Sequence, residues 1–151
     1  MERPEEIQSK VGSQLLTPEG VSPRVAVVGG TQSSAMVAQM LLAQFGCQPV
    51  AAATGEAVLG LLRRDTKVDL VLIDLSVTDM DGIVAVQLIR ALGSRGALPV
   101  VAIVGDKTEV SSNRARAAGF AGAIVKPYSP RELFTALSSA MARRASRALQ
   151  A

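Results

Sequence analysis

The sequence predicts a doubly wound α/β fold, in which a five-stranded parallel sheet is covered by helices on both faces. Two observations predict it. From Arg24 onward, short β-branched runs alternate with helical patterns in five strand–helix pairs, and strict alternation implies parallel strands joined by right-handed crossovers. Several of these runs are almost wholly apolar, as expected of strands buried on both sides. For five strands the flavodoxin-like order 2-1-3-4-5 is the common one, with its ligand crevice at the carboxyl ends of strands 1 and 3.

The elements follow one another with recognisable boundaries. In chain order the expected pairs are strand 25–28 with helix 33–45, 49–53 with 55–64, 70–73 with 83–92, 100–104 with 109–118, and 123–125 with 131–148. Gly46 follows the first helix as a C-terminal cap should. The last helix is amphipathic with a basic end. Its start is marked by Ser129 as cap, Pro130 at the first helical position and Glu132 as the capping-box partner.

Length and composition limit the classes of function. The 151 residues suit one domain at 24–148, preceded by an arm at 1–23 that is either flexible or docked. The chain has no His and one Cys, which excludes an imidazole base, a His-ligated metal, an internal disulfide and a Cys-based zinc site. No signal peptide or bilayer-spanning run is present, so we expect a cytoplasmic protein without membrane contact. The net charge of +3 comes without a dense basic face, so nucleic acid is not an expected partner.

Asp74 is the first candidate site residue, because its carboxylate ends an apolar strand at the edge where the crevice is expected. A charge in such a place is costly unless it is paired. One interpretation is a capping Asp that bonds the following loop, and the one that we favour is a ligand or reaction site. Lys126 follows the last strand at the same edge. It also fits a plain surface lysine, but the two residues support each other as a site.

The stretch 69–82 around Asp74, together with Lys126-Pro127-Tyr128, closely resembles the receiver domain of two-component response regulators. The resemblance covers most of the predicted domain and keeps these motifs in the family's order. It implies that Asp74 receives a phosphoryl group from a histidine kinase. It also implies that Lys126 contacts that group, through a peptide bond to Pro127 that is typically cis.

The chain departs from the receiver pattern at several positions that take part in phosphoryl transfer and in the switch that follows it. The acidic pair that holds Mg²⁺ in the family aligns with Gly29 and Gly30, and the family's switching hydroxyl aligns with Val104. The family's switching aromatic aligns with Ala123, and the usual Pro after the phosphoacceptor loop is Thr78. Mg²⁺ is held by carboxylates and substrate phosphate, so we expect weak or absent metal binding and no other cofactor. These losses indicate a degenerate receiver, or pseudo-receiver.

We therefore expect Asp74 and Lys126 to form a standing ion pair in a domain with one conformation. Asp79, Asp81 and Asp106 are the acidic loop residues that could rescue a metal site. For these three, a role as loop and cap carboxylates is the favoured interpretation. Conversely, placing Glu and Asp at the two glycines that align with the acidic pair is expected to restore Mg²⁺ binding.

The predicted function is that of a stand-alone, atypical receiver that acts through phosphorylation-independent protein contacts and is not an enzyme. The alternative is a conventional response regulator phosphorylated on Asp74 by a histidine kinase. A minor alternative is a flavin- or phosphate-binding protein, based on the Gly- and hydroxyl-rich loop 28–34, which matches neither the dinucleotide pattern nor the P-loop. A histidine kinase, another signalling protein and a second copy of the chain all remain open as partners.

A partner face is suggested by the family's dimer-forming surface around the last strand. Here it would carry Arg114, Arg116 and Arg131, with Phe120 and Phe134 nearby, and would suit an acidic partner. The interpretation that we favour is the plainer one, in which the two Phe belong to the core and the arginines are a solvated face.

Overall fold

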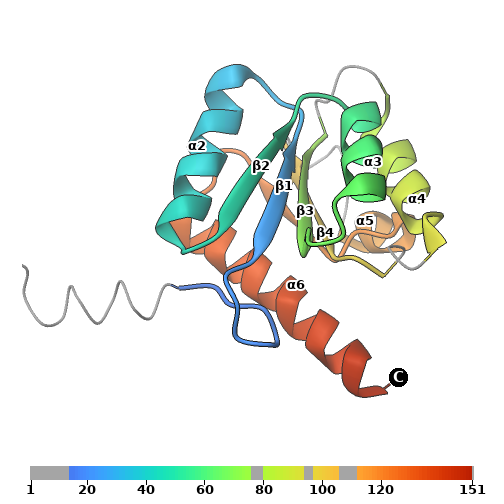
Figure 1. The fold of residues 1–151 in the computed structure, drawn as a ribbon. Helices are drawn as coiled ribbons and strands as arrows, with labels where there is room; N and C mark the ends of the chain where they lie inside the picture. The colour runs from blue at the N-terminus through green and yellow to red at the C-terminus, as the bar shows by residue number, and fades with distance from the viewer. Residues whose placement is uncertain (1–13, 76–79, 94–96, 106–111, 151) are drawn as a thin grey trace, which may run out of the picture.

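A parallel sheet of five strands forms the centre of the molecule, in the order β2-β1-β3-β4-β5 (Figure 1). The computed structural model describes residues 14–75, 80–93, 97–105 and 112–150. The elements are β1 (Arg24–Val28), α2 (Gln32–Gln44), β2 (Gln48–Ala52), α3 (Gly55–Arg64), β3 (Leu70–Asp74), α4 (Gly82–Arg90), β4 (Val100–Val104), α5 (Ser112–Ala118), β5 (Gly122–Val125) and α6 (Pro130–Gln150). The predicted fold class and strand order are confirmed.

The helices lie in two layers, with α2 and α6 on one face of the sheet and α3, α4 and α5 on the other (Figure 1). Successive strand residues point to opposite faces and enter two separate apolar clusters. In β3, for example, Leu70 and Leu72 pack with α2 and α6, whereas Val71 and Ile73 pack with α3 and α4. Burial on both faces explains why β1, β3 and β4 are apolar without alternation.

The helix boundaries are set by caps that the sequence indicates. The Ser129 hydroxyl accepts a hydrogen bond from the Glu132 amide at 3.0 Å, and Glu132 accepts one from the Ser129 amide at 3.3 Å. This reciprocal pair is the predicted capping box, and α6 begins at Pro130 as expected. Gly46 follows α2 with φ +83°. Helix α5, expected at 109–118, is described only from Ser112, because residues 109–111 lie outside the described ranges.

The described part of the N-terminal arm, residues 14–23, packs against the α2 and α6 side of the domain. Leu15 is 3% exposed within that apolar cluster, and its amide donates to the Phe45 carbonyl at 2.8 Å. The Ser22 hydroxyl donates to the Gly46 carbonyl. The arm thereby covers the end of α2 that lies away from the expected crevice. Among the described residues, no helix has the length and apolar character needed to cross a bilayer.

Candidate functional site

The candidate site lies at the carboxyl edge of the sheet and is formed by residues at the ends of β1, β3 and β5. Asp74 is the last residue of β3 and is 5% exposed. The ammonium nitrogen of Lys126 lies 2.5 Å from Oδ2 of Asp74. The Lys126 amide donates to the Val104 carbonyl at 2.8 Å, which fixes the backbone from which the side chain reaches across. The Lys126–Pro127 peptide bond is cis, as the resemblance implies.

This ion pair is asymmetric in its exposure to water. The Asp74 side chain is 7% exposed, whereas the Lys126 side chain is 31% exposed. A carboxylate this deeply buried needs a partner, because a lone buried charge loses its hydration without compensation. The lysine satisfies the carboxylate and remains partly hydrated. The expected ion pair is therefore present in the structure.

Gly29 and Gly30 follow β1 directly and turn the chain past the Asp74 carboxylate. Both have left-handed backbone conformations, with φ +73° and +82°, which L side chains rarely adopt. A Cβ atom at Gly30 would lie 2.8 Å from Oδ2 of Asp74. The loop thus approaches the carboxylate more closely than any residue with a side chain permits, and the same oxygen also contacts Lys126.

This close approach bears on one expectation drawn from the sequence. We expected that Gly29→Glu with Gly30→Asp would restore Mg²⁺ binding by replacing the missing carboxylates. At position 30, however, any Cβ collides with Asp74, and both positions strain an L residue. The double substitution would therefore disturb the Asp74 site while it adds carboxylates, and the restored Mg²⁺ binding stays a prediction.

The described residues contain no group of three or more His, Cys, Asp or Glu side chains placed to hold a metal ion. Asp81 has the cap role that we favoured for it, since its Oδ1 accepts a hydrogen bond from the Ile83 amide at 2.8 Å as the N-cap of α4. Thr78, Asp79 and Asp106 lie outside the described residues.

The two switch positions hold side chains without switch chemistry. Val104 ends β4 and is 1% exposed, so an apolar side chain lies buried where the family has a hydroxyl. Ala123 lies in β5, and its neighbour in the register on β4 is Ala102. It is exposed and carries only a methyl group. Neither side chain can follow a phosphoryl group by a hydrogen bond or by a change of ring rotamer.

Tyr128 also lies at the site, although the sequence indicates it only as part of a motif and predicts no role for it. Burial, and secondarily the negative charge of Asp74, raise the pKa of its hydroxyl. Tyr128 also lines an open hollow of about 400 Å³ together with Ser34, Val37, Lys126 and Pro127. The first turns of α2 therefore flank the ion pair. The sequence feature that could have identified Tyr128 as part of the site is its position directly after the Lys-Pro pair.

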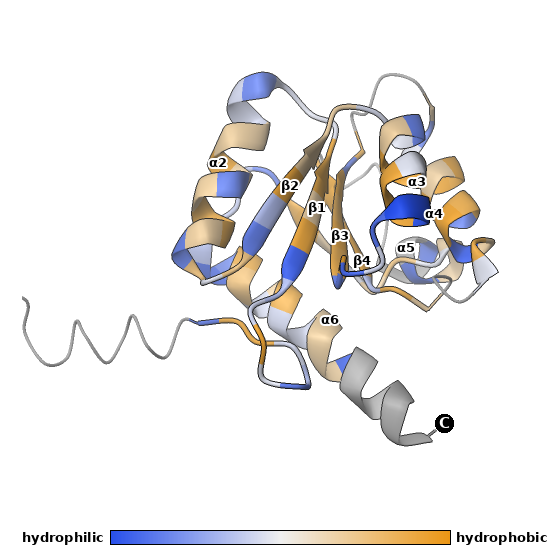
Figure 2. Cartoon of the chain, viewed as in Figure 1, coloured by the Kyte–Doolittle hydropathy of each residue, from blue (hydrophilic) through white to orange (hydrophobic). Residues whose placement is uncertain are grey.

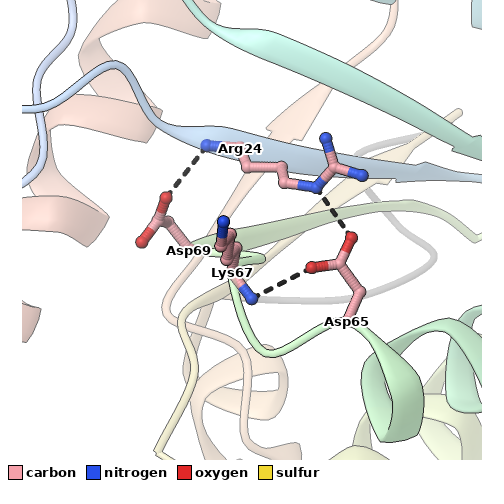
Figure 3. A network of polar contacts seen from close by, with 4 residues as sticks. All are labelled: Arg24, Asp65, Lys67 and Asp69. Carbon is pink, nitrogen blue, oxygen red and sulfur yellow. Dashed lines mark hydrogen bonds and ion pairs between the residues drawn. The ribbon is translucent and has the colours of Figure 1, made fainter.

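A larger hollow, of about 680 Å³, lies at the opposite edge of the sheet, where the arm meets β1 and the loop before β3. Figure 3 shows Arg24 between two carboxylates: its amide donates to Asp69 at 2.9 Å, and its Nε donates to Asp65 at 2.7 Å. Asp65 also accepts from the Lys67 amide at 3.0 Å. These bonds join the α3–β3 loop to the start of β1. A structural role, holding this loop against the sheet, accounts for these hydrogen bonds, so we do not take this hollow as the candidate site.

The suggested partner face separates into two kinds of residue. Arg114, Arg116 and Arg131 are exposed, on α5 and in the first turn of α6. Phe120 is 3% exposed within a core cluster, and Phe134 packs edge-on against Phe45 with ring centroids 5.2 Å apart. Phe120 is therefore a core residue and Phe134 is partly buried against the core, in line with the interpretation that we favoured.

Comparisons with known proteins match the architecture and the motif order. Residues 25–138 match the family model described as response regulator receiver domain. The sensor protein GacS of Pseudomonas syringae pv. syringae is 28% identical over 138 residues, which are 82% of this chain and 15% of that protein. The probable histidine kinase 4 of Oryza sativa subsp. japonica is 27% identical over 133 residues, or 75% of this chain and 13% of that protein. The chain thus spans less than a sixth of either relative's length.

Solved structures show the same fold at lower identity. The chemotaxis response regulator CheY4 of Vibrio cholerae superposes with a TM-score of 0.71 at 21% identity, covering 80% of this chain and 99% of that one. A putative response regulator from Chloroflexus aurantiacus J-10-fl gives a TM-score of 0.75 at 20% identity, covering 80% and 98%. At this level of identity the likeness concerns the fold.

Proposed function

The chain belongs to the response regulator receiver domain family of two-component signalling, and from that premise we propose that it acts by binding a protein partner without being phosphorylated. Asp74 and Lys126 then serve as a fixed ion pair that holds the carboxyl edge of the sheet in one conformation. The partner is a signalling protein, of which a histidine kinase is one class.

The observation that carries this proposal is the environment of the Asp74 carboxylate, whose Oδ2 is paired with Lys126 and which lies beside Gly30 in place of an acidic residue. Phosphoryl transfer requires a carboxylate oxygen that can reach phosphorus in line with the leaving group, and a cation that neutralises the charge developing on the phosphoryl oxygens. Here Oδ2 contacts Lys126 at 2.5 Å, and the Gly30 backbone passes close enough that a Cβ would lie 2.8 Å away. Of the three carboxylates that bind the metal in the family, this chain has only Asp74, because Gly29 and Gly30 occupy the positions of the acidic pair.

The proposal extends to catalysis, cofactors and location. We propose that the chain is not an enzyme, that it carries no resident cofactor and that it binds Mg²⁺ weakly or not at all. A cytoplasmic location is part of the proposal and is supported by the absence of paired cysteines in the sequence. The conventional alternative, phosphorylation on Asp74, is supported by the retained aspartate and lysine and by the similarity to a sensor protein and a probable histidine kinase.

One experiment separates these two functions. The protein is incubated with acetyl phosphate and Mg²⁺ and its intact mass is measured, with Asp74→Asn as the matched variant and a receiver that has the full acidic pair as the positive control. We expect the mass of this chain to stay unchanged while the positive control gains a phosphoryl group. A stoichiometric species heavier by roughly 80 daltons, present in the native chain and absent in Asp74→Asn, would refute the proposal and establish the conventional function.

A further inference from the structure

The outer face of α2 carries an apolar patch formed by Met36, Val37 and Met40. Their exposed fractions are 55%, 51% and 60%, the largest among the exposed apolar side chains of the described helices. Met36 and Met40 are four residues apart and so lie one turn apart on the same side of the helix. Figure 2 shows apolar colour on several turns of α2, interrupted by hydrophilic segments.

The chain segment that carries this patch has no charged residue, and the charged Lys126, which lines the same hollow as Val37, is paired with Asp74. The sequence contains no Asp, Glu, Lys or Arg between Arg24 and Glu56, a stretch that includes the whole of α2 and the edge strand β2. A surface helix of a monomeric protein ordinarily carries charges on its solvent side. A helix face that is apolar and uncharged, and that remains exposed, is typical of a protein interaction site.

We propose that a second copy of this chain docks on the α2 patch (Met36, Val37 and Met40), with the two α2 helices packed against each other around a twofold axis. In such an isologous contact each patch meets its own equivalent, so the surface must be complementary to itself. The chain has a net charge of +3, and its arginine-bearing surfaces on α3 and α5 would repel their own copies. The α2 patch meets its copy without that repulsion, and no charge on it would select a charged partner of another kind.

The size of the patch predicts a weak and reversible dimer. The 13 residues of α2 span about 20 Å at a rise of roughly 1.5 Å per residue. One helix face of that length buries a few hundred Å² per partner, below the roughly 800 Å² per partner of a standard stable interface. The contact therefore belongs with transient interfaces, which exchange at micromolar or higher concentration.

A second exposed apolar pair, on α4, provides a matched control. Val84 and Leu88 are also four residues apart and are 43% and 42% exposed. This helix carries the charged Asp81 at its N-cap and Arg90 in its last turn, so its face is neither as apolar nor as free of charge. Lys substitutions on the two helices add equal charge to equally spaced sites and differ only in the surface that they change.

The test is sedimentation velocity of the full chain over about 5 to 500 µM, a range chosen to span weak dimerisation. We expect the native chain and Val84→Lys with Leu88→Lys to show the same rise of sedimentation coefficient with concentration. Met36→Lys with Met40→Lys is expected to weaken dimerisation at least tenfold, because both apolar contact and charge neutrality are lost. Circular dichroism and thermal melting confirm that each variant is folded; because the substituted side chains are largely exposed, folding is retained.

Three outcomes would overturn the proposal: a native chain that stays monomeric throughout, equal weakening by both variant pairs, or dimerisation that falls steeply as salt rises from about 50 to about 500 mM. The last would assign the contact to charged groups, since an uncharged interface is not screened. The inference rests on the proposed function only in that the chain works through protein contacts. Dimerisation through α2 that requires acetyl phosphate would refute the proposed function and support this interface, so the two can fail separately.

Discussion

A methyl group placed on Gly30 should disturb the buried ion pair of Asp74 and Lys126. Gly30→Ala puts a Cβ 2.8 Å from Oδ2 of Asp74, whereas ordinary contacts begin at 3.4 Å. The carboxylate must therefore move by about 0.6 Å, the difference of these two values, away from a position in which it contacts Lys126 at 2.5 Å. The backbone is a second cost, because φ is +82° and an L residue in that region costs about 1 to 2 kcal/mol.

Gly20 separates the two costs, since it has the same φ of +82° and nothing within 4 Å of its added Cβ. Gly20→Ala should show the backbone cost alone. Gly30→Ala should lose a further 1 to 3 kcal/mol or so, the range for disturbing a buried polar group. For a chain of this size that corresponds to an additional fall in Tm of about 2 to 12 °C.

The assay is urea unfolding of both variants, followed by circular dichroism, with Asp74→Ala introduced into each. Removing the carboxylate takes away the collision, so the extra cost of Gly30→Ala should disappear in the Asp74→Ala background while the cost of Gly20→Ala stays the same. Equal destabilisation by the two glycine substitutions in the native background would refute the claim that the loop is packed on Asp74.

Two further predictions concern single side chains. Lys126→Met should lower the free energy of unfolding by about 1 to 3 kcal/mol, because it leaves a buried carboxylate without its cation. The control Lys67→Met, at an exposed lysine, should change the free energy of unfolding by less than about 0.5 kcal/mol. Equal changes for the two variants in urea unfolding would contradict this prediction. Burial raises the pKa of the Cys47 thiol from 9.0 to about 11. As the pH rises, the thiol of the unfolded chain loses its proton before that of the folded chain. The free energy of unfolding is therefore unchanged below about pH 9 and falls by up to about 3 kcal/mol as the pH rises through 11. Thermal melts across that range should be steeper in pH for the native chain than for Cys47→Ala, and identical slopes would show that the thiol is not the cause.

The sequence predicts those parts of the structure that depend on local chemistry. The capping box of Ser129 and Glu132 needs only residues three apart, and it is formed as expected. The strand order follows from the alternation of apolar runs and helices, because parallel crossovers leave few topologies. The strand pattern places Lys126 and Asp74 at the same edge of the sheet, but their direct contact across 52 residues of sequence was expected only through the family resemblance.

The strand order predicted that Gly30 lies near Asp74, but the distance of its approach could not be predicted, because it depends on the register of β1 and β3. Val28 pairs with Ile73, so the residues that follow each strand lie side by side at the same edge. The sequence marks the glycines as missing carboxylates, but the positive φ values that make them necessary appear only in three dimensions. The docking of Leu15 is similar, since one apolar residue in a polar arm fits a docked and a free arm equally well.

The ion pair gives a physical reason why Asp74 and Lys126 would persist even if, as we propose, this receiver transfers no phosphate. Removing one partner of a buried pair leaves an uncompensated charge, and that costs several kcal/mol more than replacing both partners by apolar groups. A chain that lost its acidic pair would be destabilised by each single substitution on the way to losing the aspartate and the lysine. The lysine would also no longer be shared among three carboxylates, and it contacts the remaining one at 2.5 Å. The retained residues are therefore explained by the stability of the sheet edge, and their presence alone is not evidence that phosphoryl transfer takes place.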